Sequence, residues 1–271
     1  MQLFVLLIFT RLMILHAGSL SAMMDELSKR FKEETSIEIV RRAGGSLFLT
    51  NLIKEKRAEW DIFFSADFNL LQDIKGTFCD TIYPFASNEM VLAYTDKSIY
   101  SKEINEKNWI QILTRKNVRI GRSNPELDPC GYRALLVLEI LKIRYGKETV
   151  DKILNNSSEK NVRPKASEVA NLLEMGELDY AFLYLNEALT RKLHYIELGD
   201  SLNFGNPELQ DYYKQFSITL KNGKVIHGDP IVYGFCINRK SKKTKEIRSF
   251  LEFWKKYGKD LTKKYNFKSL Q

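Results

Sequence analysis

The stretch Leu12-Met13-Ile14-Leu15-His16-Ala17-Gly18-Ser19 is an apolar run that ends in a glycine and a serine. The same order returns where Ile37-Glu38-Ile39-Val40 and two arginines lead into Ala43-Gly44-Gly45-Ser46. Each apolar run predicts a strand, and the residues after each Gly-Ser have the apolar spacing of a helix. Repeated strand–turn–helix units predict an α/β fold with mostly parallel sheets.

The two Gly-Ser turns also have the chemistry of an anion site. Glycine lets backbone N–H groups approach a ligand closely. A serine at a helix start offers its hydroxyl beside the first-turn amides and the positive end of the helix dipole. One such turn is usually only a loop and a cap, but two in matching contexts predict one anion held from two sides, at Gly18-Ser19 and at Ser46.

The rest of the chain continues the alternation and divides into two blocks. Further strands are predicted at 60–64, 89–94, 118–121, 179–184, 194–198 and 230–237, and an amphipathic helix at 247–257. We expect residues 12–94 and 196–271 to form lobe I, and residues 95–195 to form lobe II as an insertion. A cleft between two lobes is a common place for a ligand.

Composition narrows the function classes. The 271 residues are 44% hydrophobic, enough for a large core, and carry a formal net charge of +8. The lysines are spread out and no nucleic-acid-binding motif appears, so we expect no nucleic-acid partner and a monomer. Three distant cysteines, Cys79, Cys130 and Cys236, predict neither a disulfide framework nor a zinc site, and we expect no resident cofactor.

The N-terminus is almost wholly apolar from Gln2 to Thr10. This run is too short to span a membrane and resembles the apolar core of a secretory signal. It has no basic start and no clear cleavage site. We interpret residues 1–11 as a truncated remnant of an export signal, which predicts an extracytoplasmic protein; the alternative is an extra buried strand.

The second half of the chain adds further donors. Asp128-Pro129-Cys130-Gly131 and Ala166-Ser167 precede predicted helices, and Tyr184 ends a predicted strand on the same cleft. Together with the serines they predict an anion site built from neutral groups, without lysine or arginine. Each residue also has an ordinary structural interpretation: Tyr184 and His16 as core residues, and Asp128 as a cap.

Asp128 is the most informative of these residues. A carboxylate next to a bound dianion is repelled by it. The oxoanion of a large metal, however, can accept a carboxylate oxygen as a further ligand, which phosphate and sulfate cannot. Cys130 could be a nucleophile, because a helix N-terminus lowers the pKa of a thiol. No histidine stands where it would activate that thiol, so we favour a buried residue that offers its N–H, and no enzyme.

At these motifs the chain resembles the extracytoplasmic molybdate/tungstate-binding proteins of ABC transporters, especially their archaeal-type branch. The matching motifs are His16–Leu20, Ala43–Ser46, Ser65–Asp67, Asn88–Tyr94, Ser123–Arg133, Gly176–Phe182 and Pro230–Gly234. The resemblance implies a two-lobed periplasmic-binding-protein fold of type II, which closes on the oxyanion and delivers it to a membrane permease.

The resemblance also implies roles for single residues. Ser19 and Ser46 would donate hydroxyls and N–H groups, Cys130 its N–H and Tyr184 its phenol. Asp128 would be a carboxylate ligand to the molybdenum or tungsten of the bound ion. That branch has a second carboxylate, a glutamate at the start of the helix where this chain has Ala166. Either Glu168 substitutes through a local shift, or the site is closer to four-coordinate with backbone donors.

Three alternatives remain at this point. The chain could bind another tetrahedral oxyanion, sulfate or phosphate. It could be a Cys130-dependent enzyme. It could also be an intracellular sensor that acts with a separate DNA-binding chain. The sequence does not rank molybdate against tungstate, because the two ions have nearly the same size and shape.

Overall fold

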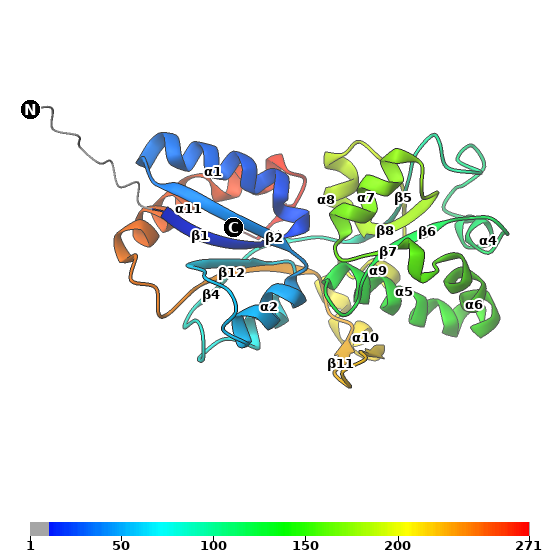
Figure 1. The fold of residues 1–271 in the computed structure, drawn as a ribbon. Coiled ribbons are helices and arrows are strands. Elements are labelled where there is room, and N and C mark those ends of the chain that lie inside the picture. Colours follow the sequence, from blue (N-terminus) through cyan, green and yellow to red (C-terminus); the bar gives the residue numbers. More distant parts are fainter. Residues whose placement is uncertain (1–10, 271) are drawn as a thin grey trace, which may run out of the picture.

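The structure, a computed structural model, describes residues 11–270, which form two α/β lobes side by side (Figure 1). The sheet of lobe I has the order β13-β4-β12-β3-β1-β2. Its strands are β1 (Arg11–Ala17), β2 (Glu38–Gly44), β3 (Ile62–Ser65), β4 (Ile82–Ser87), β12 (Val232–Ile237) and β13 (Lys268–Ser269). β1 pairs in parallel with β2 and β3, so the turns that follow these three strands meet at one edge of the sheet.

Helices cover both faces of the lobe I sheet, because both faces of its central strands are apolar. The 3-10 turn η1 (Gly18–Leu20) and α1 (Ser21–Thr35) follow β1, and α11 (Thr244–Lys264) packs beside α1 through the Phe31–Phe250 edge contact. α2 (Ser46–Lys54) and α3 (Phe68–Gln72) contribute Leu49 and Leu71 to the cluster on the other face.

The sheet of lobe II has the order β7-β6-β8-β5-β9. Its strands are β5 (Met90–Tyr94), β6 (Ile120–Ser123), β7 (Val162–Arg163), β8 (Tyr180–Tyr184) and β9 (His194–Glu197). Its helices are α4 (Trp109–Leu113), α5 (Pro129–Tyr145), α6 (Lys147–Asn156), α7 (Ala166–Met175), α8 (Leu185–Thr190), α9 (Asp200–Asn203) and α10 (Gln210–Tyr213), with short 3-10 turns η2 (Glu159–Asn161) and η3 (Pro207–Leu209). A hairpin of β10 (Ser217–Thr219) and β11 (Val225–His227) lies below the junction of the lobes in Figure 1.

The lobe boundaries differ from those expected at residues 94/95 and 195/196. β5 is antiparallel to β8 on one side and to β9 on the other, so both β5 and β9 belong to the second sheet. Their apolar pattern predicts a strand but does not say which sheet the strand joins. The chain instead crosses between β4 and β5 and returns just before β12. The two crossing segments lie side by side, with the Asn88 amide 3.2 Å from the Ile231 carbonyl oxygen.

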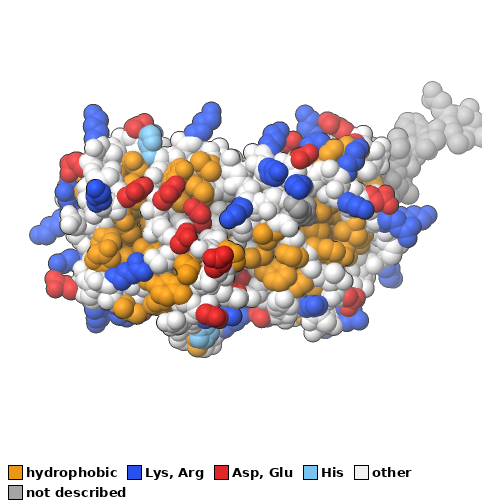
Figure 2. All heavy atoms as spheres, turned by 180° about the vertical axis from the view of Figure 1, so that it is seen from behind, with side chains coloured by type: hydrophobic (Ala, Val, Ile, Leu, Met, Phe, Trp, Pro, Cys, Tyr) orange, Lys and Arg blue, Asp and Glu red, His pale blue; other side chains and the backbone are white. Residues whose placement is uncertain are grey.

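Charge is dispersed on the molecular surface. Figure 2 shows lysine and arginine side chains spread over both lobes of the rear face. Within residues 11–270, no helix is long and apolar enough to cross a membrane. Arg11, the last residue of the interpreted export signal, opens β1 and pairs with Glu38 at 3.0 Å. The rest of the interpreted export signal, residues 1–10, lies outside the described residues.

Candidate functional site

The Gly-Ser turns of lobe I face the helix starts of lobe II. A Cβ placed on Gly45 would lie 2.2 Å from the Leu127 carbonyl oxygen and 3.1 Å from Asp128 Cβ, so α2 begins directly against the Asp128 turn. A Cβ on Gly18 would lie 3.2 Å from Ser167 Oγ, in the first turn of α7. The structure therefore brings together the four segments that the sequence singled out.

Two of the expected hydroxyl donors, Ser46 and Tyr184, each accept one hydrogen bond from the protein, which fixes the position of the hydroxyl oxygen. Ser46 Oγ accepts the Ala66 amide at 3.0 Å, and Tyr184 Oη accepts from Arg133 Nη1 at 2.6 Å. Both side chains are buried. A hydroxyl that accepts one hydrogen bond still carries a proton to donate, and none of the described residues accepts that of Ser46 or Tyr184. Both hydroxyls are thus free to donate to an anion.

Backbone amides at the same place are also free. The first amides of a helix have no acceptor within the helix. At the start of α2, the Phe48 amide donates across the cleft to Leu127 O at 3.0 Å, while none of the described residues accepts the amides of Ser46 and Leu47. At the start of α7, the Ala166 amide donates to the Asp128 carboxyl, whereas the Ser167 amide has no acceptor among the described residues. Together these amides can bind negative charge.

Asp128 occupies the centre of this arrangement. It is the N-cap of α5, followed by Pro129 in the first helical position, but its side chain does not cap its own helix. Its Oδ2 instead accepts the Ala166 amide of α7 at 2.8 Å. Burial raises the pKa of Asp128 to about 6, although the amides of Ala166 and Cys130 favour the ionised form. The Asp128 carboxyl thus lies among hydroxyl and amide donors that could bind an anion.

Cys130 and His16 have ordinary core environments. The Cys130 thiol is buried, lies 3.5 Å from the Phe182 carbonyl oxygen, and has a pKa raised by burial, so it stays protonated. This environment is the opposite of the one that activates a cysteine nucleophile. Burial also lowers the pKa of His16 to about 4, and the neutral ring has Nδ1 2.9 Å from Ala17 O.

Glu168, the expected substitute for a second carboxylate, lies at the rim. It is in the first turn of α7, with its carboxylate 3.5 Å from Lys165 Nζ and its side chain 37% exposed. Asp128, by contrast, is buried. Glu168 lines a separate pocket together with Gly45 and Leu127, the residues that precede Ser46 and Asp128.

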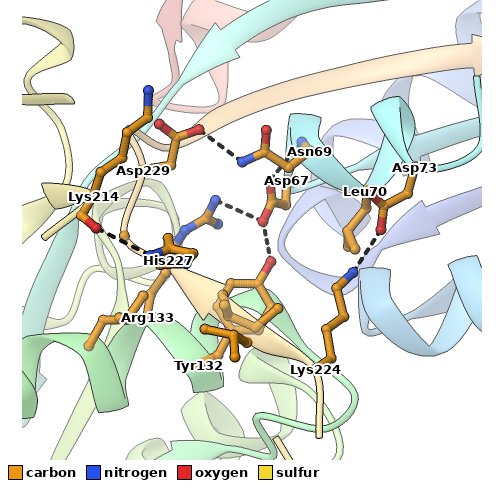
Figure 3. Close-up of a pocket in the computed structure, with 14 residues that line it drawn as sticks. Asp67, Asn69, Leu70, Asp73, Tyr132, Arg133, Lys214, Lys224, His227 and Asp229 are labelled. Atoms are coloured by element: carbon orange, nitrogen blue, oxygen red, sulfur yellow. Dashed lines mark hydrogen bonds and ion pairs between the residues drawn. The ribbon is translucent and has the colours of Figure 1, made fainter. Parts of the chain in front are cut away.

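Arg133 is a residue that the sequence analysis did not include in the site. Its buried guanidinium crosses the cleft, donating to the Ala66 carbonyl oxygen at 2.9 Å and lying 3.4 Å from Asp67 Oδ2. Figure 3 shows Asp67 facing both Arg133 and the hydroxyl of Tyr132, beside a cavity of about 270 Å³. The expectation of a site without arginine therefore needs correction, because the Arg133 guanidinium donates a hydrogen bond to the Tyr184 hydroxyl. An arginine inside the apolar helix pattern of α5 was the available signal.

A second network ties the Ser19 turn to the crossing segments. Ser19 Oγ lies 2.9 Å from Tyr233 Oη. Asn88 donates to Asn186 Oδ1 at 2.7 Å, and Asn186 donates to the Ser19 carbonyl oxygen at 3.1 Å. One turn of the cleft is thus connected to the segments about which the lobes would rotate.

Comparisons with known proteins show the family and the fold of the chain. A family model described as bacterial extracellular solute-binding protein matches residues 12–267. An uncharacterized solute-binding protein of Petrotoga mobilis is 34% identical over 250 residues, which cover 89% of this chain and 78% of that protein. The molybdate/tungstate-binding protein WtpA of Pyrococcus abyssi is 32% identical over 273 residues, covering 90% and 79%.

Among solved structures, the periplasmic molybdate-binding protein of Azotobacter vinelandii superposes with a TM-score of 0.72 at 17% identity, over 96% of this chain and 100% of that one. At that identity the likeness concerns the fold alone. It confirms the two-lobed periplasmic-binding-protein fold that the sequence predicted.

Proposed function

Because the chain belongs to the bacterial extracellular solute-binding protein family, a family of non-enzymatic partners of ABC transporters, we propose that its cleft captures molybdate or tungstate for a membrane permease. The hydroxyls of Ser19, Ser46 and Tyr184 and the amides of Ser46, Leu47 and Ser167 donate to the oxygens of the ion, while the Cys130 amide supports the Asp128 carboxylate from behind. Gly18 and Gly45 let the two lobes approach closely enough to do so.

The observation that carries this proposal is the set of unused donors around a buried carboxyl. Ser46 and Tyr184 keep their hydroxyl protons, and the amides of Ser46, Leu47 and Ser167 have no acceptor among the described residues. An ion with acceptor oxygens satisfies them all at once. Asp128 favours a metal oxoanion over sulfate, because a carboxylate oxygen can join the coordination sphere of molybdenum or tungsten.

The similarity to WtpA of Pyrococcus abyssi, a molybdate/tungstate-binding protein, supports the same assignment. At the α7 start, where Ala166 has no carboxylate and its amide donates to Asp128, the Ser167 amide is the group that meets the ion. Arg133 acts indirectly: it fixes the Tyr184 oxygen, so that the phenol proton is directed away from the guanidinium.

Titration calorimetry with tungstate, molybdate, sulfate and phosphate tests the proposal. We expect tight binding of the first two ions and at least about a hundredfold weaker binding of sulfate, a difference of about 2.7 kcal/mol. Equal or tighter binding of sulfate or phosphate would assign the cleft to those ions instead. Detecting the chain in the secreted and in the intracellular fraction of the same cells tests whether it acts outside the cytoplasm.

A further inference from the structure

Glu187 is a buried acid of the cleft to which no role has been given so far. It lies in the first turn of α8, three residues after Tyr184, and only 5% of its surface is exposed. It lines a cavity of about 270 Å³ together with Gly18, Ser19 and Ser167, the residues at which the two lobes meet. Its neighbour Asn186 donates to the Ser19 carbonyl oxygen, which holds this turn against lobe I.

One oxygen of Glu187 has no partner. Oε1 accepts from Arg191 Nε at 3.1 Å, whereas Oε2 is buried and lacks a hydrogen bond within the part of the chain that the structure describes. A buried polar atom left unsatisfied costs about 1–3 kcal/mol, so such atoms in native proteins usually serve a ligand or a bound water. Its place on the cavity wall next to the Gly18-Ser19 turn and Ser167 points to a ligand.

The charges around Glu187 come from three helices. Arg191 is the C-cap residue that follows α8, Asp128 is the N-cap of α5, and Glu174 lies on α7. Arg191 is shared, because its Nη1 also lies 2.6 Å from Glu174 Oε2. Burial raises the pKa of Glu187 to about 7, with the negative charges of Asp128 and Glu174 adding to the effect and Arg191 opposing it.

We infer that Glu187 contacts the bound oxyanion as a neutral carboxylic acid and donates its proton to one oxygen of the ion; this inference rests on the proposed function. A protonated carboxyl has one O–H donor, whereas an ionised one only accepts hydrogen bonds and repels a dianion. Each binding event above the pKa of Glu187 therefore takes up a proton from solution. In this way Glu187 favours fully deprotonated oxyanions, which need donors at every oxygen.

The experiment measures the affinity for tungstate by calorimetry from about pH 6 to about pH 9, for the native chain, E187Q and E174Q. We expect the native affinity to fall above about pH 7, approaching about tenfold per pH unit. E187Q keeps an N–H donor and loses this titration, so its affinity should not fall above about pH 7, where Asp128, with a pKa of about 6, is already ionised. Glu174 shares Arg191 but has a side chain 41% exposed, so E174Q should keep the fall, which should begin at a lower pH because the negative charge of Glu174 raises the pKa of Glu187.

A second readout does not depend on any variant. The binding heat in two buffers of different ionisation enthalpy gives the protons taken up, which we expect to approach one for the native chain above pH 7 and zero for E187Q. Native binding without proton uptake, or an E187Q profile that falls like the native one, overturns the role of Glu187 while leaving the proposed function intact. A native chain that binds none of the tetrahedral oxyanions at any pH overturns both.

Discussion

Replacing Ser46 by alanine should lower both the stability of the free protein and its affinity for tungstate, and the two losses can be measured separately. Ser46 Oγ is fully buried and accepts the Ala66 amide at 3.0 Å, and its own proton is free. In the free protein, S46A leaves the buried Ala66 amide without its acceptor, which costs about 1–3 kcal/mol of stability. In the complex, it also removes a donor to an anion. A hydrogen bond to a charged group contributes about 1.5–3 kcal/mol, so the affinity for tungstate should fall about 10- to 150-fold.

Ser65 provides the matched control. It is equally buried, donates to the Asp67 carbonyl oxygen at 2.7 Å and accepts the Asp67 amide at 3.1 Å, so it keeps no proton for a ligand. S65A should therefore lower the free energy of unfolding as S46A does, with tungstate affinity unchanged. Denaturant unfolding gives the stability and calorimetry gives the affinity. If S46A loses stability but binds tungstate within about twofold of the native chain, the hydroxyl does not touch the ion.

Three further substitutions test other parts of the cleft. D128A should weaken tungstate binding much more than sulfate binding, measured as the ratio of the two dissociation constants; an unchanged ratio would mean that the carboxylate does not bond the metal. Y184F removes the phenol proton and should cost about tenfold or more in tungstate affinity by calorimetry, and unaltered affinity would make Tyr184 a core residue only. G45A places a Cβ 2.2 Å from Leu127 O, so it should hinder closure and weaken every oxyanion by a similar factor. Small-angle scattering that finds native compaction of G45A with tungstate would contradict this expectation.

Local sequence predicted the fold and much of the cleft because both rest on strand–turn–helix units. Parallel pairing of β1 with β2 puts their carboxyl ends at one edge, and the turns at Ser19 and Ser46 follow from that. Asp128 and Tyr184 are found by the same logic in the second sheet. In each case the local sequence shows both the short motif and the strand or helix next to it.

Long-range information was missing where the predictions differed from the structure. The sheet to which β5 and β9 belong is decided by pairing with β8, more than 80 residues away from β5 in the sequence, and hydrophobic patterning does not encode the partner. The cross-cleft contact between Arg133 and Asp67 likewise depends on how α5 is rotated against lobe I. Glu187 looks like an ordinary acid near a helix start until its unpartnered oxygen is seen.

The hydrogen bond from the Phe48 amide to Leu127 O has a bearing on selectivity. It joins the two lobes directly, and neither of its atoms belongs to a ligand. Contacts of this kind raise the affinity for every ligand by the same factor, so they contribute to affinity and not to selectivity. The ion selectivity of transport would thus depend on the few groups that contact the ion itself. Substitutions at contacts between the lobes would change the affinity for all ions without changing that selectivity.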